Sequence, residues 1–331
     1  MMFISCRLML FTTVLSFALC DTLSAQQLRS KVEDLIADYA KNFESLKVYA
    51  VQYRVTEQQE PGTFFGGGRQ GKLSEIDAFQ VVDREQRFER FDLHLHTMLA
   101  NGETAGGNTR LLKRKDDWYF GHGVGDDYSV VSSEDGIPMP LQDYYGWHPF
   151  LLPFTSPGSI KLDRMSKIDS IFTLFNVERI AGIAEVGGKL RVSFLTTDES
   201  MVRFVIFDLV SGMPEHFEYL LNREKLSKEL GRAEMDFVSP SKTVQPFCVT
   251  STKWAKNADN VWLPIHVETT ARMGPKGQGD FDGVVFQLKW LDPKLIRREV
   301  FSPDDVLHPF EDRNSQINLL FNIEDEAQFE N

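Results

Sequence analysis

The sequence predicts a mainly β (α+β) protein: a strongly curved antiparallel sheet, or unclosed β-barrel, covered by an N-terminal amphipathic helix. Near the start of the chain, apolar residues recur at three- and four-residue spacing, which is typical of a helix with one buried side. Further along, many short runs alternate between apolar and polar residues, and turn residues separate them every 8–15 positions. This spacing favours an antiparallel barrel or sandwich.

The helix is predicted over Gln27–Leu46. Its apolar stripe includes Val32, Ile36, Tyr39 and Phe43, which fall on one side of a helix. Such a stripe must be covered by another element, and a sheet is the cover that this chain offers.

Strands are predicted from the period-two runs and the β-branched and aromatic residues in them. In the first half of the chain they cover Val48–Val55, Gln86–Leu99, Arg110–Phe120 and Tyr128–Ser133. In the second half they cover Ser170–Arg179, Lys189–Leu195, Val202–Leu209, Glu215–Leu221, Arg232–Val238, Phe247–Lys256, Pro264–Arg272 and Val284–Leu291. The last three make the clearest part of the sheet, because a short Asn/Asp turn joins the first two as a hairpin.

Between the two halves lies a proline-rich insert, residues 137–157, with five prolines and many aromatic residues. Prolines at this density prevent a strand in a ladder. Because an apolar surface loop of this kind is unusual, we expect the insert to pack on or into the sheet, with Leu141–Phe154 near the barrel mouth.

The first 25 residues predict where the protein is located. Residues 1–25 resemble a secretory signal peptide, since Arg7 precedes the apolar run Leu8–Leu19, which is shorter than the roughly 20 residues that span a bilayer. The alternative is a lipid anchor at Cys20. We therefore expect an exported protein, periplasmic or extracellular and not membrane-spanning, with one domain over residues 26–310 and an acidic, partly disordered tail at 311–331.

Charge and cysteine content limit the partners and the cysteine chemistry that we expect. The formal net charge of −12 argues against nucleic acid and anionic membrane surfaces as partners. Once the signal is removed, Cys248 is the sole cysteine, so no disulfide framework is expected. Because Cys248 lies inside a strand pattern, we expect an inert buried thiol.

Two histidines are weak candidates for a metal site. His94 and His96 lie two residues apart on a predicted strand, on the same side as Asp92, a spacing that suits Zn²⁺ if a further ligand comes from elsewhere. The alternative is the solvent-facing polar side of a half-buried strand. No cofactor and no catalytic residue is predicted from any other motif.

Apolar strand faces remain as candidate binding surfaces. Side chains at alternate positions share one face on several strands, and those chosen as ligand contacts are Phe194, Tyr219, Phe286, Leu288 and Trp290. One interpretation is an ordinary core under the helix. The other is a partly open barrel that holds a lipid or another apolar ligand.

The order of these elements resembles a known family. An amphipathic helix, Val32 to Leu46, is followed by a strand-rich body that ends in Trp254, Asn260-Val-Trp-Leu-Pro264 and Val267-Glu268. This pattern resembles the LolA/LolB-like superfamily of periplasmic lipoprotein carriers and their outer-membrane lipoprotein-sorting relatives. The resemblance implies a half-barrel that wraps helices, holds acyl chains and meets a lipoprotein or envelope partner; it assigns no functional residue here.

Three functions stay open on the sequence. The first is non-catalytic binding of a lipid, acyl chain or lipidated partner. The second is a metal-dependent hydrolase using His94 and His96. The third is a structural or interaction module whose barrel is filled by its own side chains.

Overall fold

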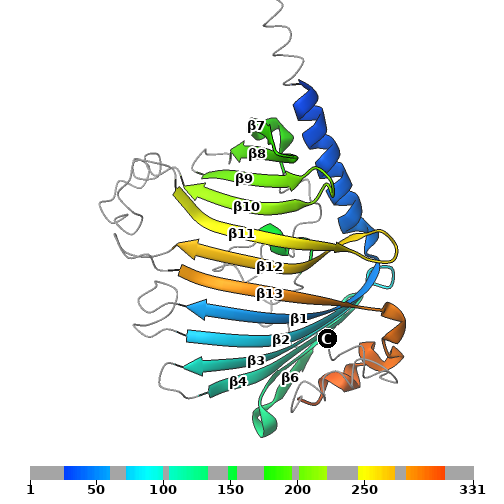
Figure 1. Cartoon of the computed structure of the whole chain (residues 1–331). Helices are drawn as coiled ribbons and strands as arrows, with labels where there is room; N and C mark the ends of the chain where they lie inside the picture. The colour runs from blue at the N-terminus through cyan, green and yellow to red at the C-terminus, as the bar shows by residue number, and fades with distance from the viewer. Residues whose placement is uncertain are drawn as a thin grey trace, which may run out of the picture.

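A computed structural model describes residues 26–59, 72–99, 104–132, 148–154, 175–195, 201–221, 245–272 and 281–309. They form one N-terminal helix, residues 26–45, and one antiparallel sheet of 13 strands (Figure 1). The predicted signal peptide, a Gly-rich loop expected over Pro61–Gly71, the predicted strand Arg232–Val238 and the acidic tail lie outside the described residues.

The strands are β1 (Val48–Gln59), β2 (Lys72–Asp83), β3 (Phe88–Leu99), β4 (Thr104–Arg114), β5 (Asp117–Gly123), β6 (Ser129–Ser132), β7 (Ile180–Val186), β8 (Lys189–Leu195), β9 (Met201–Asp208), β10 (Pro214–Leu221), β11 (Gln245–Lys256), β12 (Trp262–Arg272) and β13 (Phe281–Leu291). Their order in the sheet is β6-β5-β4-β3-β2-β1-β13-β12-β11-β10-β9-β8-β7. Of the described strands, β6 and β7 are the two edges and do not pair with each other, so the sheet stays open. The predicted fold class is therefore confirmed.

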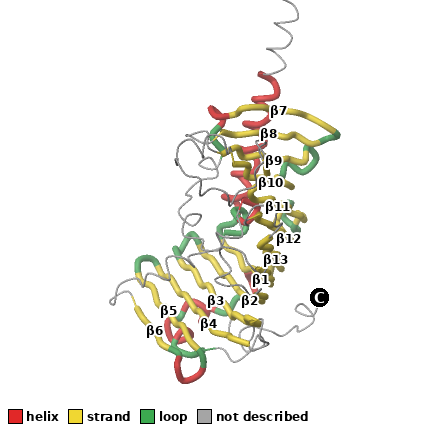
Figure 2. The backbone as a smooth tube through the Cα atoms, turned by 90° about the vertical axis from the view of Figure 1, so that its left-hand side faces the viewer, coloured by secondary structure: helices red, strands yellow, loops and turns green. Residues whose placement is uncertain are grey.

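The sheet turns strongly along its length. In Figure 2 the strands from β7 to β13 are seen nearly edge-on, while β1 to β6 are seen face-on. The join between these two parts is the antiparallel pair β1–β13, in which Tyr53 lies opposite Leu288. This pair joins an N-terminal strand to a C-terminal one, so both ends of the described chain contribute to the middle of the sheet.

The N-terminal helix packs on one face of the sheet, which we call the inner face. Its apolar stripe is buried, as predicted, with Val32, Ile36 and Tyr39 fully enclosed. The helix crosses the strands: Lys31 pairs with Glu185 of β7 at 2.8 Å, and the Asn42 side chain accepts a hydrogen bond from the Trp262 N–H at the start of β12. The chain then enters β1 directly after the helix.

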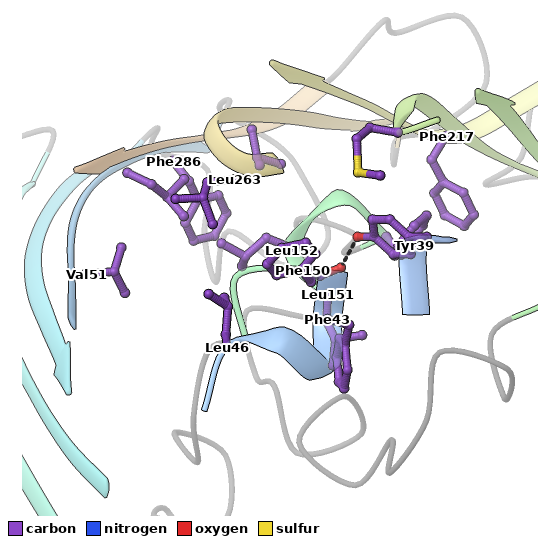
Figure 3. Close-up of a cluster of buried hydrophobic side chains, with 14 of the residues drawn as sticks. Tyr39, Phe43, Leu46, Val51, Phe150, Leu151, Leu152, Phe217, Leu263 and Phe286 are labelled. Atoms are coloured by element: carbon purple, nitrogen blue, oxygen red, sulfur yellow. Dashed lines mark hydrogen bonds between the residues drawn. The ribbon is translucent and has the colours of Figure 1, made fainter. Parts of the chain in front are cut away.

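Part of the proline-rich insert packs into the same core. Residues 148–154, which include the short 3-10 helix η4 (Leu152–Phe154), are buried between the helix and the sheet (Figure 3). The Tyr39 hydroxyl donates a hydrogen bond to the Phe150 carbonyl, and the Tyr39 and Phe154 rings meet edge to face at 5.8 Å. This part of the insert lies against the sheet, as expected, whereas residues 141–147 lie outside the described residues.

The opposite, outer face carries a second, smaller core. The C-terminal segment forms three 3-10 helices, η10 (Pro293–Leu295), η11 (Arg298–Phe301) and η12 (Pro303–Val306), which cross the outer face of β1 to β5. Val300 is buried there with Ala50, Phe79, Val81 and Leu291. Strands β1 to β3 are therefore buried on both faces over part of their length.

Four predictions about individual strands were wrong or incomplete. The run Arg110–Phe120 is a hairpin, β4 and β5, whose turn places Lys115 at φ 56°. Strands β2 and β7 were not predicted. The end of the predicted strand Ser170–Arg179 is the 3-10 helix η8 (Val177–Arg179), because the Asn176 side chain caps its first turn.

No helix in the described part of the chain is long and apolar enough to cross a membrane.

Candidate functional site

The predicted ligand contacts lie in two separate places on the inner face. Phe286 and Leu288 are buried on β13, and Trp290, on the same strand, is half-buried and donates its indole N–H to the Pro264 carbonyl at 2.8 Å. Phe194, on β8, packs its ring 5.6 Å from that of Phe175. Five strand spacings separate β13 from β8, or about 24 Å along the sheet.

The fifth predicted contact, Tyr219, is on β10, where its backbone pairs with Cys248 and Arg203. Its side chain lies outside the described residues. Phe194 and the β13 residues cannot contact the same end of one small ligand, because of the distance between them. Their role as ligand contacts stays a prediction.

A polar cluster lies beside Leu288 and Trp290. The Tyr53 hydroxyl on β1 donates to the Gln80 side-chain oxygen on β2 at 2.7 Å, and the Gln80 amide donates to Glu89 on β3 at 3.1 Å. Tyr53 and Gln80 are 0% and 1% exposed, and Glu89 is half-buried. The cross-strand register places this polar cluster among apolar inner-face neighbours.

Burial sets the protonation behaviour of this cluster. Desolvation raises the pKa of Glu89, while the hydrogen bond from Gln80 and the positive charges of Lys113 and Arg84 act in the opposite direction. Burial also raises the pKa of Tyr53, so its hydroxyl stays protonated and available as a donor. The cluster is thus a chain of donors that ends on a carboxyl group.

Arg84 connects the polar cluster to the end of the N-terminal helix. Its guanidinium donates to the Phe43 carbonyl at 3.4 Å, contacts the His148 ring nitrogen Nε2, and stands 5.3 Å from the centre of the Phe43 ring. The His148 ring stacks on Phe43 at 4.1 Å, and burial together with the Arg84 charge holds the pKa of His148 well below its usual range. His148 is therefore neutral at pH 7, as stacking on Phe43 and contact with Arg84 require.

The two candidate metal ligands lie on the outer face. His94 and His96 have ring centres 4.2 Å apart, and Asp77 lies opposite His94 in the register. The Asp77 carboxylate pairs with Arg54 at 3.4 Å. Within the described ranges, no group of three His, Cys, Asp or Glu side chains could hold a metal ion.

Asp92 shares the outer face with these histidines, but its predicted solvent-facing position is wrong. It is 0% exposed, and both of its carboxylate oxygens accept a hydrogen bond from Arg90 Nε at 3.0 Å. Arg110, also 0% exposed, donates to Asp92 at 3.3 Å. The C-terminal segment covers this ion cluster, which explains its burial, and Asp92 is committed to the two arginines.

The C-terminal segment is held over the ion cluster by its carbonyl groups. The Asp305 carbonyl accepts from Arg90 at 3.5 Å, and the His308 carbonyl accepts from Arg110. The Tyr128 hydroxyl donates to the Val306 carbonyl at 2.9 Å. The two arginines therefore join the last described segment to the middle of β3 and β4.

Cys248 is a buried structural thiol, as predicted. It is 1% exposed and lies 3.4 Å from the Thr269 hydroxyl. Burial raises the pKa of this thiol, which disfavours the nucleophilic thiolate.

Sequence reasoning missed the polar cluster and the ion cluster. Gln80 belongs to β2, which was not predicted, and Glu89 lies inside the predicted strand Gln86–Leu99 without having been recognised as an inner-face residue. Arg90 and Arg110 carried no local signal, since their partner Asp92 was interpreted either as a neighbour of the candidate metal ligands or as part of a solvent-facing polar side. The one sign in the sequence was the spacing of Glu89, Phe91 and Leu93. They stand two residues apart on one strand, so the Glu89 carboxyl group faces the core together with the two apolar side chains.

Comparison with known proteins gives weak structural likenesses. No family model and no curated protein matches the sequence. Among solved structures, a DUF1329 family protein from Desulfovibrio piger ATCC 29098 aligns with 8% identity and a TM-score of 0.43, over 83% of this chain and 98% of that chain. A beta-barrel-like protein of domain of unknown function DUF1849 from Brucella abortus aligns with 9% identity and a TM-score of 0.22, over 75% and 99%. These values carry no inference about function, and the likeness to lipoprotein carriers stays a resemblance.

Proposed function

We propose that this chain is an exported, non-catalytic binding protein for a lipid, an acyl chain or a lipidated partner of the cell envelope. The supporting observation is an apolar inner face that extends well beyond the reach of the helix that packs on it. Export is proposed from the charged and apolar pattern of residues 1–25.

The dimensions of the two elements support this. A helix of 20 residues is about 30 Å long, whereas 13 strands at about 4.8 Å spacing span about 58 Å. The helix side-chain contacts extend from Glu185 on β7 to Trp262 on β12, and its last turn leads into β1. On the next two strands the inner face continues with Ile76, Leu93 and Leu95, which belong to or pack on the same apolar cluster.

We place the ligand site at this part of the inner face, where β13, β1, β2 and β3 adjoin. Two of the sequence-predicted contacts, Leu288 and Trp290, lie there. An apolar surface with a few convergent polar groups is the usual make-up of a site for a small apolar ligand. The polar cluster of Tyr53, Gln80 and Glu89 supplies those groups.

Two measurements test this function. Native mass spectrometry of gently purified protein should show a co-purified apolar ligand, and a fluorescent fatty-acid probe should bind to the protein after delipidation. Protein that is always ligand-free, together with no binding of the probe, would overturn the proposal.

A variant pair locates the site. Leu95→Ser on the inner face should weaken probe binding about tenfold, since burial of a leucine side chain in an apolar site contributes at least that factor. Val285→Ser is the matched control, because Val285 is half-buried on the outer face of β13. Equal effects of the two substitutions would move the site away from the inner face.

A further inference from the structure

The His148 ring is held between two hydrogen-bond donors. The Arg84 guanidinium donates to its nitrogen Nε2, and the Phe150 N–H donates to its nitrogen Nδ1 at 3.3 Å. A neutral imidazole has one nitrogen that accepts a hydrogen bond, so it satisfies one of the two donors, whereas a protonated imidazole accepts from neither. The geometry of this site therefore excludes the charged form of His148.

The elements packed around His148 add a positive charge and no negative one. The N-terminal helix contributes the uncharged Phe43 ring, which stacks on the imidazole at 4.1 Å. Strand β1 contributes Tyr49, whose ring lies 6.3 Å away and whose pKa is raised by burial, so it stays uncharged. The turn between β2 and β3 contributes Arg84, so a proton on His148 meets a second cation in direct contact.

The two acidic side chains on this side of Arg84 do not offset that repulsion. Glu85 pairs with Lys47 at 3.5 Å, and both of these side chains are exposed. Burial raises the pKa of Glu89, and Lys113 and Arg84 act on it in the opposite direction. The charge that acts on His148 is that of Arg84.

His148 begins the buried part of the proline-rich insert. Its carbonyl accepts hydrogen bonds from the Leu151 N–H at 2.8 Å and the Leu152 N–H at 3.3 Å. The next ring along the segment, Phe150, packs 5.7 Å from the Tyr39 ring of the helix. The placement of His148 therefore helps to hold residues 148–154 between the helix and the sheet.

From this geometry we propose that His148 is a pH-sensitive anchor: protonation of its ring favours local release of residues 148–154 from the space between the N-terminal helix and the sheet. The released imidazole can take up the proton that the buried one cannot, so acidification below about pH 6.5 stabilises the released state relative to the buried one. Release also uncovers Tyr49, whose ring packs 6.0 Å from that of Trp290, one of the proposed ligand contacts. Acid should thus open this part of the inner face, a consequence that rests on the proposed function, whereas the release itself does not.

Hydrogen exchange of the ligand-free, full-length protein tests the anchor. Protection factors, which correct the exchange rates for the intrinsic effect of pH, are measured at pH 7 and pH 5. For peptides that cover residues 148–154 the protection should fall about 25-fold, the ratio expected when the released imidazole titrates near pH 6.5 and the buried one does not. At both pH values it should be lower than the protection of β11 and β12, because local release costs less free energy than global unfolding.

Three variants assign the effect to one group. His148→Phe keeps a ring stacked on Phe43 but cannot bind a proton, so residues 148–154 should lose the 25-fold change. Glu89→Gln should retain it. His266→Phe is the matched control and should also retain it, because His266 is half-buried on the outer face of β12.

The outcomes separate this inference from the proposed function. Unchanged protection of residues 148–154 in the wild type, or protection equal to that of β11 and β12, would overturn local release. A change that persists in His148→Phe, or is lost in Glu89→Gln, would overturn the role of His148. The wild-type measurement needs no variant and no ligand, so the anchor is tested even if His148→Phe does not fold, and its failure leaves the proposed function in place.

Discussion

The buried ion cluster gives the sharpest prediction about stability. Asp92 is the one carboxylate that the structure shows hydrogen-bonded to Arg90 and Arg110, and all three side chains are 0% exposed. Asp92→Asn keeps the size of the side chain and removes its charge. Two guanidinium groups would then remain buried without their counter-ion.

The expected loss is about 3–5 kcal/mol of unfolding free energy, the usual effect of removing one partner from a fully buried ion pair. At about 2 °C per kcal/mol for a chain of this size, the unfolding temperature should fall by about 6–10 °C. Equilibrium unfolding in urea, followed by far-ultraviolet circular dichroism, measures the free energy directly. A loss of less than 1 kcal/mol would show that the cluster does not hold the outer core.

Two further variants test the reasoning. Asp77→Asn removes the partner of Arg54 at a site where the arginine side chain is 53% exposed, so its effect should stay below about 1 kcal/mol. Joint replacement of Arg90, Asp92 and Arg110 by Met, Leu and Met should cost less than Asp92→Asn alone, because it leaves no unpaired charge. A triple variant that is less stable than Asp92→Asn would contradict this account.

Three other predictions concern single sites. Gly121→Ala should destabilise the protein by about 1–3 kcal/mol in urea unfolding, because a Cβ atom would stand 1.8 Å from the Tyr128 hydroxyl, whereas Gly283→Ala, with nothing within 4 Å, should cost nothing; equal effects would refute the packing argument. Because the pKa of His148 is lower in the folded state, the unfolded state binds more protons below about pH 6.5, so stability should fall by up to about 1.4 kcal/mol per pH unit below that value. His148→Phe should lose this slope, and an unchanged slope would assign it to another group. Cys248 should react with iodoacetamide slowly in native protein and quickly in urea; rapid native labelling would contradict its burial.

The sequence predicted those elements whose signals are local. The helix was placed within one residue at each end, because its apolar residues recur at three- and four-residue spacing and the period changes to two from Val48. Strands β8 to β13 were placed within three residues at each end, since alternation and clear turns define them. Such a strand alternates between apolar and polar residues because one of its faces is buried and the other is exposed to solvent.

The missed strands lack that pattern for physical reasons. Strand β2 is buried on its outer face by Phe79 and Val81 and on its inner face by Ala78 and Val82, so the run shows no alternation. Strand β7 is an edge strand of small, mostly exposed residues. In the β4–β5 hairpin, the turn contains Lys115 at positive φ, where glycine would have given a signal.

Pro264 stands in a strand that is not at an edge of the sheet. Proline within a strand favours an edge position, but β12 lies between β11 and β13. Proline is tolerated there because Pro264 lies at a bulge opposite Trp254, beyond the last β12–β13 pair at His266. Its carbonyl instead accepts the Trp290 indole N–H.

Each face of β1 to β4 buries a polar cluster, and the two clusters differ in charge. On the outer face both oxygens of Asp92 accept hydrogen bonds from arginine, and carbonyl groups of the C-terminal segment accept from the same two arginines. Arg90 Nη1 and Asp305 Oδ2 are buried there without a hydrogen-bond partner among the described residues. On the inner face Tyr53 donates to Gln80 and Gln80 donates to Glu89. Substitution of Asp92 should therefore lower stability more than substitution of Glu89, because it leaves two buried guanidinium groups without their counter-ion.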